Sequence, residues 1–271
     1  MNANADSERF RNGAEKYAAY LQTPEGRLRL DLTFANLQEF LPQAMRSLRV
    51  LDIGSGTGAI AIRLARLGLH VTLLDSSLPM LDFAERAARE AGVTDRIALQ
   101  YGDVSQLRDL FLPGSFDVIL CHNILEYVDN PCAALSCAAR GLRNRSSLIS
   151  ILVRSQAGEV LKTGIQAGDL ALAENNLAAE WAHESLYGGR VRLFTPDGLQ
   201  TMLKVAHLIS AAERGVRVVS DYLPPQVCRT TAYERIFELE RKLGRRAEFA
   251  AIARYMHCLA RSEASITKDS V

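Results

Sequence analysis

A glycine-rich stretch with a carboxylate beside it is the part of the sequence best suited to bind a ligand. In RVLDIGSGTGAIAIRLARLG, residues 49–68, Gly54 and Gly56 with Ala59 satisfy the pattern G-x-G-x-x-G/A, which holds the pyrophosphate of a dinucleotide. Asp52 precedes the first glycine, where its charge would repel a pyrophosphate and attract an ammonium or sulfonium cation. The loop suits a dinucleotide or an uncharged adenosyl group with a cationic end, and Asp52 favours the second.

More polar residues stand where the following predicted strands end. Asp75 ends the second strand, where an acid can accept hydrogen bonds from both ribose hydroxyls of a nucleoside. Asp103 ends the third strand and could accept from an adenine amino group, while His122 and Asn123 end the fourth. Because ligands of open α/β sheets bind beyond the carboxyl ends of the strands, these side chains are expected to face one cleft together with the glycine loop.

Short apolar runs alternate with amphipathic helical segments between Val50 and Arg154. This alternation predicts right-handed parallel crossovers, and therefore an α/β, doubly wound sheet with helices on both faces. The predicted strands are 49–54, 70–75, 97–103, 116–123 and 146–154. The predicted helices are 58–68, 77–92 and 130–143, the second with Pro79 in its first turn and Gly92 at its end.

The pattern changes after Arg154. Residues 155–193 contain helical segments and no clear strand, which predicts a helical lid inserted into the core. A helix over 194–206 with Thr195 as N-cap and Pro196 in its first position then returns to the core pattern. We expect a strand over 208–223 interrupted near Gly215, a helix over 231–244 and a last strand near 254–261. The predicted division is an N-terminal helical cap at 1–47, a ligand-binding core at 48–154, the lid at 155–193, the remaining core sheet at 194–262 and a disordered tail at 263–271.

The composition favours a folded chain without a membrane segment. Of 271 residues 48% are hydrophobic, yet no apolar run approaches the roughly 18 to 20 residues that a membrane helix needs. The N-terminus lacks the apolar centre of a signal peptide, so a cytoplasmic protein is expected. The odd number of cysteines and the scattered histidines predict buried thiols and no metal site; the cysteines are Cys121, Cys132, Cys137, Cys228 and Cys258.

Arginine dominates the cations, with 27 arginines among the 32 Lys and Arg residues. The arginine fork suits paired hydrogen bonds to carboxylate or phosphate, although a GC-rich genome would produce the same bias. The net charge of +1 does not indicate a nucleic-acid binder. Three pairs could contact phosphates or simply be solvated surface charges: Arg143 and Arg145, Arg190 and Arg192, and Arg245 and Arg246.

The motifs VLDIGSGTG, LLDSS, GDV and FDVILCHNILEYV, in this order, resemble those of class I S-adenosylmethionine-dependent methyltransferases over about residues 48–154. The resemblance implies a mostly parallel seven-stranded sheet whose last strand is antiparallel. It departs from the family before the fifth strand, where RNRSS replaces a proline and paired glycines. Taken with the segments described next, it implies these cofactor-binding residues: Arg29, Asp52, Gly54, Gly56, Asp75, Ser76, Asp103, Val104 and His122.

Segments outside that core are similar to the bacterial tRNA 5-carboxymethoxyuridine methyltransferases, which esterify an acid on a modified wobble uridine. These segments are TPEGRLRLD, HNILEYV, GVRVVSDYL, YERIFELE and ARYMHCLAR. On this resemblance Arg29 and His122 contact the cofactor, Arg217 faces the substrate, and tRNA is a partner. His122 and Arg217 are then the candidates for a catalytic role.

A carboxylate acceptor would need no catalytic base, because an acid with a pKa near 4 is already ionised at neutral pH. The protein need only align donor and acceptor and exclude water. The lid has a single lysine, Lys162, where the tRNA enzymes carry a lysine-rich run, so a small-molecule O- or N-methyltransferase is the main alternative. A nicotinamide-dependent oxidoreductase or a non-catalytic binding protein is a further alternative that uses only the glycine pattern.

Four aromatic residues could stack on an adenine or on a flipped base, although packing in the core or lid is the commoner role: Tyr17, Tyr20, Tyr127 and Trp181. For the remaining histidines a structural role is expected; they are His70, His183, His207 and His257.

Overall fold

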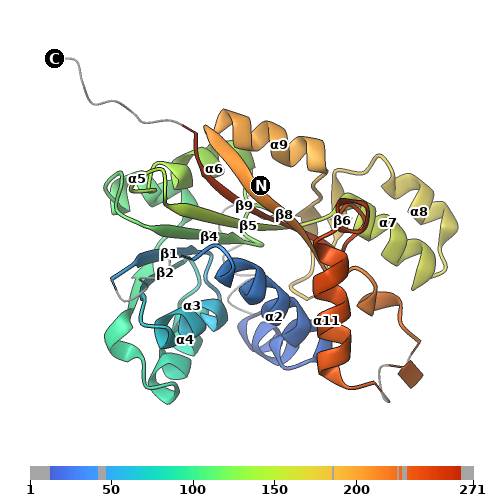
Figure 1. Cartoon of the computed structure of the whole chain (residues 1–271), viewed down its shortest axis with the longest axis horizontal. Coiled ribbons are helices and arrows are strands. Elements are labelled where there is room, and N and C mark those ends of the chain that lie inside the picture. The colour runs from blue at the N-terminus through green and yellow to red at the C-terminus, as the bar shows by residue number, and fades with distance from the viewer. Residues whose placement is uncertain (1–12, 42–46, 185, 225, 228–230, 264–271) are drawn as a thin grey trace.

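The computed structural model describes residues 13–41, 47–184, 186–224, 226–227 and 231–263. Within these residues the chain forms a seven-stranded sheet of order β3-β2-β1-β4-β5-β9-β8, in which the first five strands are parallel and β9 is antiparallel to both neighbours (Figure 1). The predicted fold class is confirmed. The strands are β1 (Arg49–Ile53), β2 (His70–Asp75), β3 (Ile97–Tyr101), β4 (Val118–His122), β5 (Leu148–Arg154), β8 (Leu208–Val216) and β9 (Tyr255–Ser262).

Helices cover both faces of the sheet (Figure 1). One face carries α2 (Pro24–Gln38), α3 (Ala59–Arg66), α4 (Leu78–Glu90) and α11 (Tyr233–Gly244), and the other carries α5 (Leu107–Leu110), α6 (Pro131–Ala139) and α9 (Pro196–Val205). The predicted cap of α9 is present, since Thr195 Oγ1 accepts from Gly198 N at 3.1 Å and Pro196 opens the helix. Residues 13–21 are also helical, and α12 (Ala247–Ala250) follows α11.

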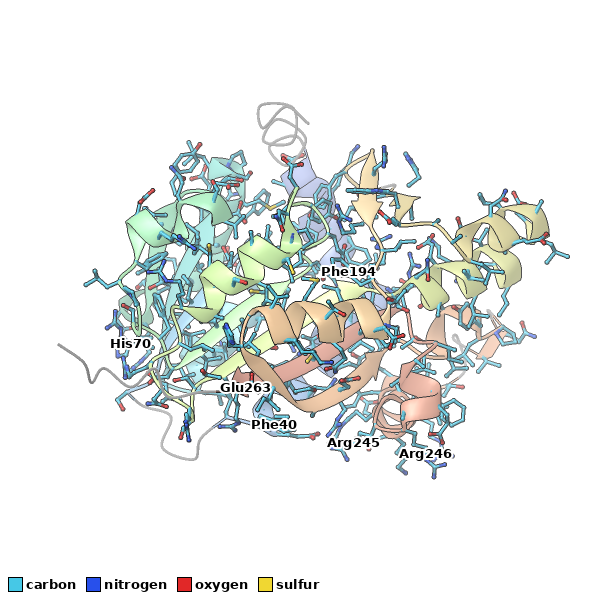
Figure 2. The ribbon with its side chains drawn as sticks, turned by 90° about the horizontal axis from the view of Figure 1, so that it is seen from above. Phe40, His70, Phe194, Arg245, Arg246 and Glu263 are labelled. Carbon is cyan, nitrogen blue, oxygen red and sulfur yellow. The ribbon has the colours of Figure 1, made fainter. Side chains whose placement is uncertain are left out.

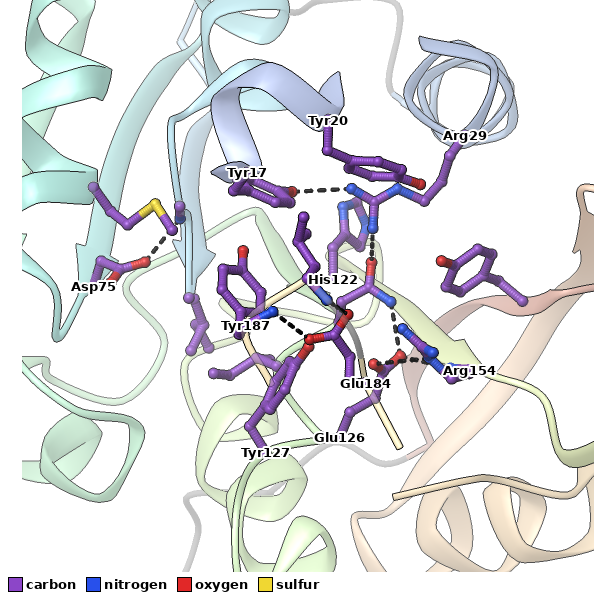
Figure 3. A pocket seen from close by; sticks show the side chains of 18 of the residues that line it. Tyr17, Tyr20, Arg29, Asp75, His122, Glu126, Tyr127, Arg154, Glu184 and Tyr187 are labelled. Atoms are coloured by element: carbon purple, nitrogen blue, oxygen red, sulfur yellow. Dashed lines mark hydrogen bonds and ion pairs between the residues drawn. The ribbon is translucent and has the colours of Figure 1, made fainter. Parts of the chain in front are cut away.

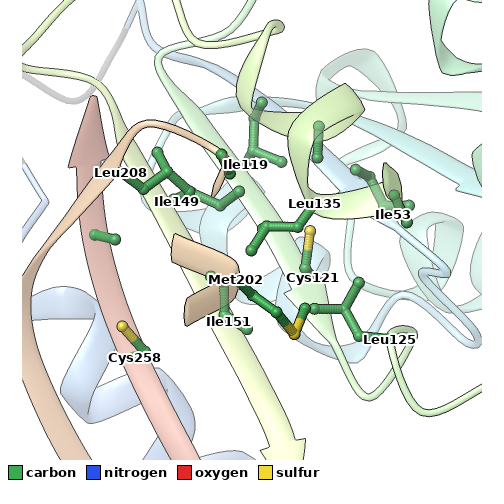
Figure 4. Close-up of a cluster of buried hydrophobic side chains, with 14 of the residues drawn as sticks. Ile53, Ile119, Cys121, Leu125, Leu135, Ile149, Ile151, Met202, Leu208 and Cys258 are labelled. Carbon is green, nitrogen blue, oxygen red and sulfur yellow. The ribbon is translucent and has the colours of Figure 1, made fainter. Parts of the chain in front are cut away.

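Alternating strand residues build two apolar layers. Leu51 and Ile53 pack in the layer beneath α5, α6 and α9, while Val50, which precedes Leu51, packs in the layer beneath α3 and α4. Figure 4 shows the first layer, with Cys121 and Cys258 among its aliphatic side chains. Both cysteines are buried as predicted, whereas Cys132 and Cys137 are half-buried and Cys228 lies outside the described residues. Burial on both faces is typical of the parallel strands of α/β folds.

The segment 155–193 is not purely helical, so that part of the prediction is wrong. Two helices, α7 (Gln156–Ile165) and α8 (Leu170–Asn176), are followed by an antiparallel pair of strands, β6 (Trp181–His183) and β7 (Arg190–Arg192). Each strand has only three residues, which is too short to give a period-2 pattern. Arg190 and Arg192 cover the Trp181 indole, their guanidinium carbons 4.6 and 4.4 Å from its ring centroid. The pair therefore rests on cation–π contacts and on buried Val191.

The predicted strand over 208–223 is shorter than expected. β8 ends at Val216, Arg217 takes a positive φ of 62°, and a short 3₁₀ turn, η3 (Ser220–Tyr222), follows. The irregularity lies between Ser210 and Ala212 and not at Gly215. Gly215 instead allows close packing, because a Cβ there would stand 2.8 Å from Ala250 Cα. The predicted tail lies outside the described residues except for Glu263, and no described helix is long and apolar enough to cross a membrane.

Candidate functional site

A cavity of about 700 Å³ opens at the carboxyl ends of β1, β2, β3 and β4, where the sequence places its candidate residues (Figure 3). One end, the glycine-loop end, is lined by Gly54, Gly56, Asp75, Ser76, Asp103 and Val104. The other, the arginine end, is lined by Arg154, Lys162, Arg217, Arg254 and Tyr255. Arg29 and His122 also line the cavity. Parallel strands bring their carboxyl ends to one edge, and the antiparallel β9 begins at that edge, so both ends belong to one site.

The glycine loop is held in a backbone conformation that residues with side chains rarely adopt. Gly54 and Gly56 have φ of 65° and 54°. A Cβ on Gly54 would stand 2.8 Å from Ile124, and one on Gly56 would stand 3.1 Å from the Tyr17 ring. Gly54 N donates to the Leu74 carbonyl at 2.8 Å, which fastens the loop to the end of β2. The loop thus leaves bare backbone along the cavity wall.

Asp75 joins the loop to the start of α4. Its two carboxylate oxygens accept from Gly56 N and Ser77 N, each at 2.8 Å. Burial raises the pKa of Asp75, although these backbone N–H groups act in the opposite direction. Each oxygen can accept more than one hydrogen bond, so Asp75 can also receive donors from a ligand.

Asp52 is buried beside a second, smaller cavity of about 40 Å³ that shares Gly54, Arg29 and His122 with the main one. Its carboxyl group has no hydrogen bond from any described residue. Burial, with a contribution from the charge of Asp75, raises the pKa of Asp52 to about 8. A buried acid without a partner is costly, and a cation placed beside it would offset that cost.

Arg29 reaches the site from the buried side of α2. Its guanidinium donates to Asn123 Oδ1 at 2.8 Å and to the Tyr17 hydroxyl at 3.0 Å. Asn123 has a positive φ of 57° and donates in turn to Glu126 Oε1 at 2.7 Å. The residue after β4 is therefore held from both sides, and Arg29 is fixed with its charge facing the cavity centre (Figure 3).

His122 ends β4 and lies between the two cavities. Its Nε2 is 2.8 Å from Ser150 Oγ on the adjacent strand. Burial, followed by the nearby His257 and Arg29, holds the pKa of His122 well below the usual value. The imidazole is therefore neutral at pH 7 and acts as a hydrogen-bonding group, not as a cation.

Asp103 caps the short turn after β3, where its Oδ1 accepts from Ser105 N at 2.8 Å. The side chain is exposed, so its second oxygen is open to a ligand. Ser76 and Val104 line the cavity beside it. These three residues provide the outer wall of the glycine-loop end.

Three arginines of the arginine end, together with Arg29, act on Tyr255. Arg217 is ion-paired with Asp221 and donates to the Tyr20 hydroxyl at 3.1 Å, and Arg254 is ion-paired with Glu159. Burial alone would raise the pKa of Tyr255, but Arg154, Arg29, Arg217 and Arg254 lower it below the usual value. These four arginines have three acidic partners among them, Glu126, Glu159 and Asp221, so an excess of positive charge remains around this hydroxyl.

Tyrosines form the walls between the two ends. The Tyr17 and Tyr187 ring centroids are 6.0 Å apart, and those of Tyr127 and Tyr187 are 6.3 Å apart in an edge-to-face arrangement (Figure 3). Tyr20 lines the cavity near Arg29. Trp181 does not line it and packs in the β6–β7 pair.

The structure brings together every residue predicted from the sequence as a cofactor contact, with Asp52 in the smaller cavity. Of the arginine pairs, Arg190 and Arg192 lie in the β6–β7 pair, whose connecting segment reaches the cavity through Glu184 and Tyr187. Arg143 pairs with Asp117 at the opposite edge of the sheet, and Arg245 and Arg246 follow α11 (Figure 2). Among the described residues no group of three His, Cys, Asp or Glu side chains could hold a metal ion.

Sequence reasoning missed several residues that line the cavity. Arg154 ends β5 and Arg254 directly precedes β9. Ligand-binding residues are expected at the carboxyl ends of parallel strands, and this rule, which located Asp75 and His122, also applies to Arg154. An antiparallel last strand begins at the same edge of the sheet, so the rule could have been extended to Arg254 and Tyr255. Glu126 in the segment HNILEYV carried no signal of its own, whereas Asn123 was expected at the cleft.

Comparisons with known proteins agree with this geometry. A model of the methyltransferase domain family matches residues 45–233. A tRNA 5-carboxymethoxyuridine methyltransferase of Escherichia coli strain K12 is 29% identical over 270 residues, 97% of this chain and 98% of that protein. A ubiquinone biosynthesis O-methyltransferase of Paracidovorax citrulli is 39% identical over 93 residues, 34% of this chain and 38% of that protein. The crystal structure of a magnesium protoporphyrin IX methyltransferase from Synechocystis PCC 6803 with bound SAH aligns over 96% of this chain and all of that one, with 15% identity and a TM-score of 0.64.

Proposed function

Because the chain belongs to the family of S-adenosylmethionine-dependent methyltransferases, we propose that its methyl acceptor is a carboxylate, carried by a 5-carboxymethoxyuridine-type nucleoside in tRNA. The observation that carries this proposal is the group of cations that lines the arginine end of the cavity, Arg154, Lys162, Arg217 and Arg254. These arginines and Arg29 also lower the pKa of Tyr255 despite its burial. The family match over residues 45–233 also excludes the alternative of a nicotinamide-dependent oxidoreductase.

The residues at the glycine-loop end fit S-adenosylmethionine. Asp75 would accept from the ribose hydroxyls, Asp103 from the adenine amino group, and the bare backbone of Gly54 and Gly56 would lie along the methionine part. Asp52, which lacks a partner among the described residues, would face the ammonium group. When bound, the cofactor would supply a methyl group on a sulfonium ion, and S-adenosylhomocysteine would be the leaving group when an acceptor oxygen takes that methyl group.

Arg29 and His122 would contact the amino-acid end of the same cofactor. Arg29 is charged and held by Asn123 and Tyr17, so it suits a carboxylate. His122 is neutral and can add one hydrogen bond. Together with Asp52, these groups match the opposite charges of an amino acid.

The arginine end suits an anionic acceptor. A carboxylate with a pKa near 4 is ionised at neutral pH, and the cations there would keep it so. Arg217 and Arg254 carry forks that match carboxylate geometry, while their acidic partners Asp221 and Glu159 hold them in place. The reaction then needs alignment of two bound groups and exclusion of water, without a base that removes a proton.

The choice of tRNA rests on the relative that is 29% identical over 97% of this chain, whose name includes the carboxymethoxy acid. The ubiquinone biosynthesis relative spans 34% of this chain, so it bears on the core and not on the arginine end. The segment 155–193 has a single lysine, Lys162, and this favours a small-molecule acid as the second candidate.

Incubation with radiolabelled S-adenosylmethionine tests the proposal. The substrates to compare are tRNA that bears the free 5-carboxymethoxy acid, the same tRNA without it, and small aromatic acids and phenols. We expect label in the first tRNA alone, on the wobble nucleoside after digestion. Label in a small acid but not in RNA would support the second candidate, and transfer to a phenol alone would contradict a carboxylate acceptor.

A further inference from the structure

A chain of buried polar side chains runs from the cavity through the sheet to α2. His122 Nε2 is 2.8 Å from Ser150 Oγ, and the same oxygen is 2.8 Å from His257 Nε2. His257 Nδ1 is 3.4 Å from Asn36 Nδ2. The four residues come from β4, β5, β9 and α2, and β5 lies between the other two strands. The serine hydroxyl therefore bridges two imidazoles whose ring centroids are 5.6 Å apart.

These buried polar side chains are costly to remove from water. Ser150 and His257 are 0% exposed and Asn36 is 4% exposed. Burying a polar group destabilises the fold unless that group is hydrogen-bonded, and aliphatic residues at these positions would need no partners. Of the three, none lines the cavity, so they can act on a ligand through His122 alone.

The positions of the hydrogens follow from the donors and acceptors. Burial lowers the pKa of His257 to about 3 and holds that of His122 well below the usual value, so both rings are neutral and each has one donor and one acceptor. The Asn36 amide donates to His257 Nδ1, which places the His257 hydrogen on Nε2, where it is donated to Ser150. The single hydroxyl hydrogen of Ser150 then goes to His122 Nε2. The hydrogen of His122 is left on Nδ1.

We propose that Ser150, His257 and Asn36 are positioning residues that hold His122 in the Nδ1–H tautomer, so that it presents a hydrogen-bond donor to the carboxylate of the cofactor's amino-acid end. His122 Nδ1 has no hydrogen-bond partner among the described residues, and the ring lines both cavities. Arg29, the other group suited to that carboxylate, lies beside the ring and contributes to lowering its pKa. The inference rests on the cofactor placement proposed above.

Nitrogen-15 NMR of the histidine rings in the free protein tests the tautomer directly. The wild-type chain should show His122 with a protonated Nδ1 and an unprotonated Nε2. Ser150→Ala removes the bridge, and Asn36→Leu removes the donor that sets its direction; in both, His122 should become a mixture of tautomers. Ser147→Ala is the matched control, because Ser147 is also a buried serine with a hydrogen-bonded hydroxyl but has no contact with His122 or His257 in the hydrogen-bond network described above. Thermal unfolding establishes that each variant is folded.

Calorimetry with S-adenosylhomocysteine gives the second readout. Loss of an aligned donor to a charged group should weaken binding by roughly ten-fold in Ser150→Ala and leave Ser147→Ala unchanged. If Ser150→Ala kept the wild-type tautomer and affinity while only its stability fell, the three residues would be structural and the inference would be overturned. If the wild-type protein did not bind S-adenosylhomocysteine, the proposed cofactor placement would fail. The tautomer of His122 in the free protein would still decide whether Ser150, His257 and Asn36 orient this ring.

Discussion

At the scale of single residues, Asp52 gives the sharpest information about the ligand. Its pKa of about 8 means that most of the free protein carries a protonated Asp52 at pH 7. A cation beside the carboxyl favours the ionised form, so binding of the cofactor's ammonium group should expel the proton. Ligand binding and proton release are therefore coupled at this residue.

We predict that S-adenosylhomocysteine binding at pH 7 releases close to one proton from Asp52, and that affinity rises as the pH is increased from 6 to 8. Calorimetry in buffers of different ionisation enthalpy measures this proton directly. Asp52→Asn should bind more weakly and release no proton. Binding of the wild-type chain without proton exchange would contradict the assignment of Asp52 to the ammonium group.

Asp52 also makes the stability of the fold depend on pH. The folded-state pKa of Asp52 lies above its unfolded value of 3.8, so the native state binds more protons between these values. Its contribution to the free energy of unfolding is full below about pH 4 and is lost as the pH rises through about 8. Urea unfolding of Asp52→Asn should lack this component of the pH dependence.

Arg217 tests the acceptor end at the same scale. Arg217→Lys keeps a positive charge for buried Asp221 but loses the planar fork. We predict that KM for the acid acceptor rises by roughly ten-fold or more, through loss of about 1.5 to 3 kcal/mol of charge-assisted hydrogen bonding, while affinity for S-adenosylhomocysteine stays within two-fold. Arg145→Lys, exposed and outside the cavity, is the control. An unchanged KM would remove Arg217 from the acceptor site.

At the scale of elements, the sequence predicted the strands and helices that show hydrophobic periodicity and have capping or helix-breaking residues at their ends. The strand over 70–75 agrees with β2 at both ends, and Thr195 and Pro196 open α9. The β6–β7 pair escaped detection because its stability comes from the contacts of Trp181 with two arginines, which have no sequence period. Arg254 and Tyr255 escaped because a strand is usually searched for ligand residues at its carboxyl end only.

Gly244 tests how α11 fixes the arginine end. A Cβ on Gly244 would stand 2.2 Å from the Gly215 carbonyl oxygen, so α11 can approach β8 only with glycine there. We predict that Gly244→Ala lowers the free energy of unfolding by about 1 to 3 kcal/mol, and that the shift of β8 also raises KM for the acceptor. Gly164→Ala in α7 has ordinary space, with Ala173 Cβ at 3.6 Å, and should be neutral or slightly stabilising. Urea denaturation compares the two; equal stability would contradict the packing argument.

At the scale of the whole molecule, the charge distribution matters more than the total. Thirty-two Lys and Arg residues against 31 Asp and Glu residues give a net charge of +1, which by itself indicates no anionic partner. The fold nevertheless gathers four arginines from α2, β5, the segment after β8 and the segment before β9 around one tyrosine. Sequence composition could not predict this, because those residues lie far apart along the chain and meet only when the antiparallel β9 enters the sheet.

The central claim is tested most directly by the kind of bond that joins the transferred methyl group to its acceptor. After reaction of the protein with labelled S-adenosylmethionine and tRNA bearing the free acid, the product is treated with mild alkali, which cleaves a methyl ester and leaves methyl ethers and N-methyl groups intact. We predict that the label leaves the nucleoside as methanol and the original acid is regenerated. Label that stays on the nucleoside after this treatment would contradict a carboxylate acceptor.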